Sequence, residues 1–131
     1  MTSKKVLIIA SILGAIAVIM GAMGAHALES LISPNSLKSY LTGARYNMVH
    51  AITLVALAGN QHHIHPKWFK ISTYTFLIGT VLFSGSIYLL STSSITGIEA
   101  KSVLGPITPM GGLVLISGWV SLATGALKAK N

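Results

Sequence analysis

The stretch VLIIASILGAIAVIMGAMGA, residues 6–25, decides the fold class of this chain. It contains no charged side chain, and about 20 apolar residues in a helix are enough to cross the roughly 30 Å hydrocarbon core of a bilayer. Together with Lys4 and Lys5 and the sequence Ala25-His26-Ala27, it also resembles a signal peptide with its cleavage site. Further apolar segments follow it, so the sequence predicts a membrane protein under either interpretation.

Three more apolar segments of similar length lie downstream. The expected spans are at about residues 6–25, 41–59, 71–90 and 109–127. The sequence therefore predicts an all-α membrane protein with a single domain over residues 1–131, in which four transmembrane helices form a compact bundle. No linker or low-complexity segment divides the chain.

Two of these segments carry a local signal for the start of a helix. Ser33-Pro34 and Thr108-Pro109 each place an N-cap residue before a proline at the first helical position. The first signal predicts a helix from Pro34 through Gly59 that ends near Asn60. The second predicts that the last helix begins at Thr108-Pro109.

The composition also points to lipid as the solvent. Hydrophobic residues make up 52% of the chain and charged residues only 8%, against about 25% in soluble domains. The mean hydropathy is +0.73. A water-soluble fold would have to expose most of this apolar surface, and a disordered chain needs low hydrophobicity and high charge. Both classes are therefore excluded.

The net charge of +7 comes from nine Lys and Arg against two Asp and Glu. Such an excess suggests nucleic acid in a soluble protein. Here long apolar runs separate the positive charges, so the predicted partner is the lipid bilayer with its anionic headgroups, and no nucleic acid is expected. The absence of cysteine excludes disulfides, cysteine-based zinc sites and a cysteine nucleophile.

The distribution of charge predicts the orientation. With four spans, both termini and the middle connection share one side of the membrane. Six lysines and no acidic residue belong to that side: Lys4, Lys5, Lys67, Lys70, Lys128 and Lys130. The other side holds Lys38, Arg45, Lys101, Glu29 and Glu99. The positive-inside rule then places both termini in the cytoplasm.

Polar side chains near the first two spans are the main candidates for a functional site. We expect a polar cluster at the outer ends of these helices, formed by His26, Glu29, Arg45, Tyr46, Asn47 and His50, with Ser84, Ser86 and Thr108 as weaker candidates. A polar group inside a membrane is a functional hypothesis by default, since an arginine at mid-depth costs roughly 2.5–3.5 kcal/mol. The alternatives are hydrogen bonds that tie helix ends together, a proton relay, a ligand site, or a metal or haem site.

Two further features have weaker chemical implications. The tract of His62, His63 and His65 is a weak candidate for a metal site, because it lacks cysteine and clustered carboxylates. We predict no bound metal or cofactor. Trp119 falls near the middle of the last span, where it is expected to pack with its indole N–H bonded to a partner. With only two acidic residues, most acid–base and metal-hydrolase mechanisms lack their parts, so no enzymatic activity is predicted.

Glycines predict how the helices pack. Lipid tails are as apolar as leucine, so close packing of small residues takes the place of hydrophobic burial. The predicted packing positions are Gly14, Gly21, Gly24, Gly111, Gly118 and Gly125. The last three recur every seven residues, which keeps one groove on one face of the helix.

Four motifs, taken in order, resemble a known family. They are Gly21–His26 (GAMGAH), the Tyr46/His50/Ala51 set, Leu82–Tyr88 (LFSGSIY), and Gly105–Gly112 (GPITPMGG) with Gly118-Trp119 after it. The chain is similar over nearly its whole length to the YgdD/YwdK-type small inner-membrane proteins, the domain-of-unknown-function 423 family. The resemblance implies a four-helix protein of unsettled activity, and it marks His26, Tyr46 and His50 as motif positions. Gly105-Pro106 departs from the more common Gly-Ala, which places the helix start there in doubt.

Three hypotheses for the function follow. The first is a non-enzymatic accessory, scaffold or membrane-integrity component of the bacterial inner membrane, acting as a homo-oligomer or as a subunit of a larger membrane complex. The second is an oligomeric carrier or channel for protons or small molecules that uses His26, Arg45 and His50. The third is a redox component in which His26 and His50 ligate haem or a metal.

Overall fold

The computed structural model describes residues 1–129. Five α-helices and one short 3-10 helix follow one another: α1 (Ser3–Ala25), α2 (Pro34–Gly59), η1 (Gln61–His63), α3 (Pro66–Ser91), α4 (Ser93–Thr96) and α5 (Lys101–Leu127). Within residues 1–129 there is no strand, so the all-helical prediction is confirmed. Lys130, which was counted on the basic side of the predicted topology, lies outside the described residues.

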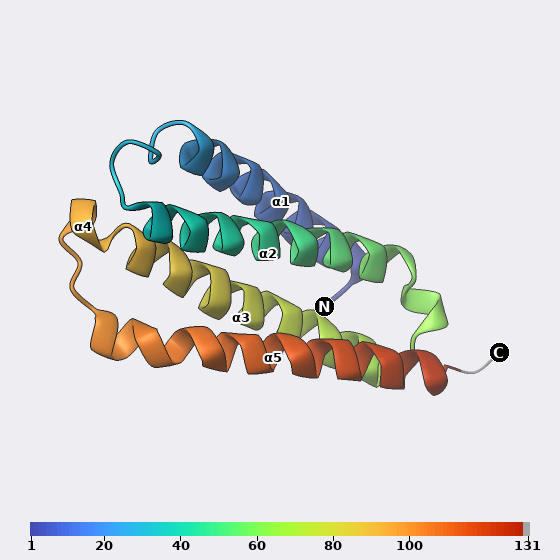
Figure 1. Ribbon diagram of the computed structural model, residues 1–131. Helices are drawn as coiled ribbons and strands as arrows, with labels where there is room; N and C mark the ends of the chain where they lie inside the picture. Colours follow the sequence, from blue (N-terminus) through green and yellow to red (C-terminus); the bar gives the residue numbers. More distant parts are fainter. Residues whose placement is uncertain (130–131) are drawn as a thin grey trace.

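The four long helices lie side by side and alternate in direction (Figure 1). The extensive contacts are between α1 and α2, between α2 and α3, and above all between α3 and α5. The start of α1, the η1 connection and the end of α5 lie at one end of the molecule. The connection between α1 and α2 lies at the other end, together with α4 (Figure 1).

The boundaries of α2 confirm the prediction made from Ser33-Pro34. The Ser33 Oγ atom accepts a hydrogen bond from the Ser36 backbone N–H at 3.1 Å, Pro34 opens the helix, and Asn60 is its C-cap. A side-chain oxygen at the N-cap satisfies a backbone donor that the helix itself leaves free. These local signals were therefore sufficient to define both ends of α2.

The start of α5 was predicted wrongly. The helix begins at Lys101, and Thr108-Pro109 lies inside it together with Pro106. A proline inside a helix removes one backbone hydrogen bond and disfavours a helical conformation at the residue before it, chiefly through that residue's Cβ. Gly105 has no Cβ, so it tolerates the helical conformation before Pro106. The N-cap signal and the interior proline look alike in the sequence.

The outer surface of the helices is apolar. Three of the four long helices, α1, α3 and α5, are long and apolar enough to cross a membrane. Large apolar side chains point outward on every long helix, for example those of Val18, Ile52, Val81 and Leu113. In a water-soluble helical bundle the outward-facing side chains are mainly polar, so this surface shows the opposite pattern. The helix α2 is absent from this group because Lys38, Arg45, Asn47 and His50 lie along it.

The interior contains two clusters of buried apolar side chains. The larger includes Val6, Leu54, Phe76 and Leu115, and so draws on all four long helices. The smaller lies at the α4 end and joins Leu28, Ile32 and Tyr40. The candidate site is formed by buried polar residues, among them Asn47, His50, Ser84 and Ser86.

Candidate functional site

His50 lies at the junction of three helices. Its Nδ1 atom is 2.8 Å from the Tyr46 carbonyl oxygen one turn earlier in α2, and its Nε2 atom is 3.3 Å from the indole Nε1 of Trp119 in α5. The carbonyl can only accept and the indole N–H can only donate. These two bonds together define the neutral tautomer with the proton on Nδ1. Trp119 thus has the hydrogen-bond partner that its position in the sequence required.

Aromatic rings surround this junction. The Phe76 ring of α3 lies 5.6 Å from the His50 ring and 5.1 Å from the Trp119 ring, centroid to centroid, with an edge-to-face geometry toward Trp119. Tyr46 packs against Phe83 of α3 at 4.7 Å. Edge-to-face contacts at these distances are favourable beyond the area they bury. The ring of His50 therefore helps to hold α2, α3 and α5 together.

Asn47 forms the second polar link of α2. Its Nδ2 atom donates to the Tyr88 hydroxyl of α3 at 3.3 Å, and the Tyr88 ring also packs on Tyr40 at 5.1 Å. The Asn47 side chain is buried, and within residues 1–129 its Oδ1 atom has no hydrogen-bond partner. Asn47 thus connects α2 to α3, with one acceptor left unused.

Serine and threonine side chains make two further links. The Ser84 hydroxyl of α3 donates to the Gly43 carbonyl of α2 at 2.8 Å. The hydroxyls of Ser86 in α3 and Thr108 in α5 are 2.7 Å apart. The three weaker candidates of the sequence analysis therefore all take part in hydrogen bonds between helices.

The structure does not bring the remaining candidates into this cluster. His26 is the C-cap of α1 and Glu29 lies in the connection after it, so the two do not share a helix face. Both are exposed, as is Arg45. Tyr46 is 43% exposed and contributes its backbone carbonyl and its ring. The cluster lies between α2, α3 and α5, and not at the outer ends of the first two helices as predicted.

The three α5 glycines of the seven-residue repeat face α3 and the turn before it. A Cβ atom at Gly111 would lie 2.5 Å from the Phe83 backbone nitrogen, and one at Gly118 would lie 2.8 Å from the Phe76 ring. A Cβ atom at Gly125 would meet Ile64 at 2.7 Å. The groove predicted from the seven-residue repeat is thus filled by the same chain.

The three glycines of α1 differ from one another. A Cβ atom at Gly24 would lie 2.7 Å from Leu41, whereas one at Gly14 would make an ordinary contact of 3.8 Å with Ala51. A Cβ atom at Gly21 would meet nothing within 4 Å. Only Gly24 therefore marks a close approach between α1 and α2.

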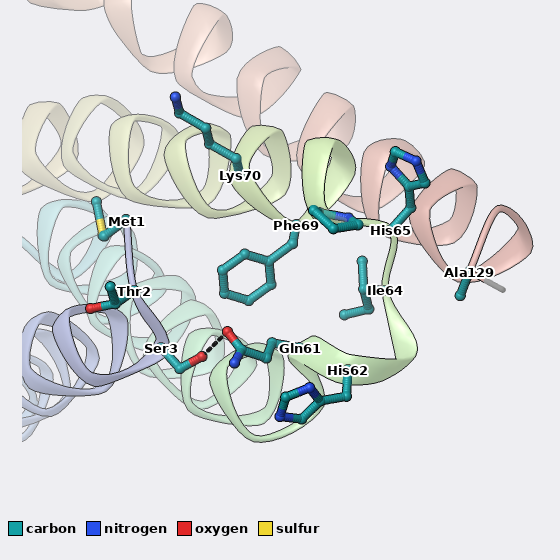
Figure 2. Close-up of a pocket in the computed structure, with 11 residues that line it drawn as sticks. Met1, Thr2, Ser3, Gln61, His62, Ile64, His65, Phe69, Lys70 and Ala129 are labelled. Atoms are coloured by element: carbon teal, nitrogen blue, oxygen red, sulfur yellow. Dashed lines mark hydrogen bonds between the residues drawn. The ribbon is translucent and has the colours of Figure 1, made fainter. Parts of the chain in front are cut away.

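Two of the three histidines of the α2–α3 connection, His62 and His65, line a cavity at the end of the molecule (Figure 2). His62 and His63 are exposed in η1, and His65 caps α3, with its Nδ1 atom accepting from the Lys67 backbone N–H at 3.3 Å. In residues 1–129 no group of three His, Cys, Asp or Glu side chains is placed to hold a metal ion.

Besides Trp119, which was expected only as a packing residue, two residues that contact the cluster, Tyr88 and Phe76, were not among the predicted site residues. Tyr88 ends the LFSGSIY motif, so a polar ring at that position was a usable signal. No signal in the sequence marked Phe76, because a phenylalanine in an apolar span cannot be distinguished from a lipid-facing residue. Its contact with Trp119 joins residues that no sequence spacing relates.

Helices with apolar outer faces and a hydrogen-bonded polar interior define a helical membrane protein. The comparison with known proteins agrees. A family model described as "Protein of unknown function (DUF423)" matches residues 20–112. The chain is 36% identical over 128 residues to a UPF0382 membrane protein of Haemophilus influenzae, a match that covers 98% of each chain.

Two further relatives have similar values. The UPF0382 inner membrane protein YgdD of Escherichia coli K12 is 35% identical over 131 residues, 100% of this chain and 95% of its own. The UPF0382 membrane protein YwdK of Bacillus subtilis is 37% identical over 130 residues, 95% of this chain and 98% of its own. No solved structure matches. This chain belongs to the DUF423 (UPF0382) family, and it is a multi-pass inner-membrane protein.

Proposed function

We propose that this protein is a non-enzymatic accessory or scaffold component of the inner membrane, which works as a homo-oligomer or within a larger complex. The observation that supports this role is that the buried polar side chains form hydrogen bonds between helices. His50, Asn47 and Ser84 each bond across to another helix. These groups join helices, which is a structural task.

A carrier would need its polar groups to line a path for the transported species. Five cavities within residues 1–129 lie at the two ends and on the outer faces, and neither Asn47 nor His50 lines any of these five. A haem or metal ligand needs a free ring nitrogen, whereas both nitrogens of His50 are hydrogen-bonded. These observations favour the structural role over the two alternatives.

The proposed arrangement has four membrane crossings and both termini in the cytoplasm. It requires α2 to cross as well, with Asn47 and His50 shielded by α3 and α5. The natural chain contains no cysteine, so single cysteines can be labelled without background. Ser30→Cys reports on the α1–α2 connection, and His63→Cys reports on the α2–α3 connection; both positions are exposed.

We expect a membrane-impermeant maleimide to label Ser30→Cys in intact spheroplasts and to label His63→Cys only after permeabilisation. The physical reason is that a crossing α2 puts the two connections on opposite sides. Labelling of both cysteines in intact spheroplasts would show that α2 does not cross, which leaves the three crossings of α1, α3 and α5. The reversed pattern would place the termini outside.

The role itself is tested by native mass spectrometry after gentle extraction from the protein's own membrane. We expect a discrete assembly, either several copies of the chain or the chain with a second protein in a constant ratio. A monomer that carries only lipid would contradict the proposal.

A transport assay provides the complementary measurement. The purified protein in liposomes is expected to leave an imposed proton gradient unchanged relative to empty liposomes. A proton flux that disappears in the variant His50→Gln would replace the accessory role with a carrier.

A further inference from the structure

The end of the molecule that holds the start of α1 and the η1 connection contains a cavity of about 780 Å³. Figure 2 shows it between the first residues of α1, the η1 turn and the first turns of α3. The accessory role makes no use of this cavity, and none of the buried polar residues of the His50 junction lines it.

The lining of the cavity is amphipathic. Ile64 and Phe69 are buried and form an apolar floor, with the Phe69 ring directed into the space (Figure 2). A hydrogen bond from the Ser3 hydroxyl to the Gln61 side chain closes one wall. Lys70 lies at the rim on the α3 side. The cavity is therefore bounded by both apolar and polar side chains, with one lysine at its rim.

The residues of this rim can donate to an anion. The Nδ1 atom of His65 accepts from the Lys67 backbone N–H, so the proton of the neutral ring is on Nε2, which is free to donate. Lys70 adds an ammonium group and His62 a second imidazole. No aspartate or glutamate lines the cavity. The site thus offers donors and positive charge without a competing carboxylate.

The surrounding surface strengthens the same preference. Four more lysines of the described chain lie at this end, Lys4, Lys5, Lys67 and Lys128. Both acidic residues are at the opposite end: Glu29 is in the α1–α2 connection, and Glu99 lies between α4 and α5 (Figure 1). Clusters of lysine at a membrane surface attract anionic lipids, at about 1 kcal/mol for each charge.

We propose that this cavity binds the phosphate of an anionic phospholipid headgroup. The phosphate lies at the rim beside Lys70, whose side chain is exposed, and the glycerol end of the acyl chains lies on Ile64 and Phe69. A free phosphate ion carries the same charge but has no apolar part that could contact Ile64 and Phe69. The position of the cavity at the end of apolar helices also puts it at the depth of the headgroups.

The test compares two lysines of the same helix. Lys70 lines the cavity, whereas Lys67, one turn earlier and exposed like it, does not. Lys70→Gln and Lys67→Gln each remove one positive charge from the same end of the molecule. Native mass spectrometry of the detergent-purified full chain measures the affinity for added phosphatidylglycerol, with zwitterionic phosphatidylcholine as the reference lipid.

We expect the unchanged protein to retain phosphatidylglycerol in preference to phosphatidylcholine. Lys70→Gln should weaken that binding about fivefold, the value that corresponds to one surface charge. Lys67→Gln should weaken it less than twofold. Equal losses in the two variants, or equal retention of the two lipids by the unchanged protein, would overturn the proposal and leave only diffuse attraction to a basic surface.

A second arm separates the two sources of phosphate. Inorganic phosphate at millimolar concentration is added to the protein with bound phosphatidylglycerol. Retention of the lipid supports the headgroup site, and displacement of the lipid would assign the cavity to a soluble anion instead. Thermal unfolding of both variants should match that of the unchanged protein, because both lysines are exposed. Lipid retention is measured separately from protein assembly, so this proposal and the accessory role fail independently.

Discussion

Gly111→Ala is expected to destabilise the protein by about 1–3 kcal/mol, although alanine is the better helix former. The added Cβ atom would lie 2.5 Å from the Phe83 backbone nitrogen and 2.9 Å from its Cα atom. A side chain could rotate away from such a contact, but the backbone of α3 cannot. Helices α3 and α5 would have to separate along their largest interface.

The measurement is equilibrium unfolding in mixed micelles of mild detergent and dodecyl sulfate, followed by circular dichroism. Gly112→Ala is the matched control, since the nearest atom to its added Cβ would be a Phe83 ring carbon at 3.8 Å, an ordinary contact. That variant is expected to be unchanged or more stable by up to about 1 kcal/mol, from helix propensity. If the two variants unfold alike, α3 and α5 do not approach as closely as described.

His50→Ala is expected to cost about 2–3 kcal/mol, for two reasons. The side chain is 3% exposed and fills the space beside Phe76, so its removal leaves a cavity. It also removes the acceptor of the Trp119 N–H. The loss is smaller than for the largest changes in soluble cores, because the unfolded helices remain in an apolar solvent.

A double-mutant cycle separates the two contributions. Trp119→Phe keeps an aromatic ring against Phe76 but removes the N–H donor together with part of the indole surface. The hydrogen bond accounts for about 0.6 kcal/mol of its cost, and at most about 1.7 kcal/mol. That part of the cost should disappear when His50 is already alanine. Tyr46→Phe is the control: within the described chain its hydroxyl makes no hydrogen bond, so stability should not change. Additive costs for His50 and Trp119 would show that their side chains do not interact.

The sequence permitted a partial prediction of this site. Asn47 and His50 could be singled out because polar side chains in an apolar helix are costly. Arg45 was grouped with them because it is adjacent in the chain. At about 100° per residue, Arg45 lies on the opposite side of α2 from Asn47, and the structure leaves it exposed. Helical periodicity could have separated them, but only the partners of α2 define which side is buried.

The groups that His50 and Asn47 contact could not be predicted. Trp119 is 69 residues from His50 and Tyr88 is 41 residues from Asn47. No spacing relates residues on different helices, because the pairing depends on how α2 and α5 pack on α3. The packing of α5 on α3 also decided which residues the α5 glycines contact. Gly118 contacts Phe76 within the chain, although the seven-residue pattern alone is equally typical of a surface for another copy.

The sequence by itself determined the solvent, the helical class and the ends of α2. These properties depend on uninterrupted apolar runs, on the low charge and on the local chemistry of Ser33-Pro34, and all of them act over a few neighbouring residues. The tertiary structure alone decided that α5 continues through Pro106 and Pro109, that His50 is buried and His26 is exposed, and that a basic cavity forms beside Phe69. Those outcomes depend on contacts between helices, and a contact between distant residues leaves no local pattern in a single sequence.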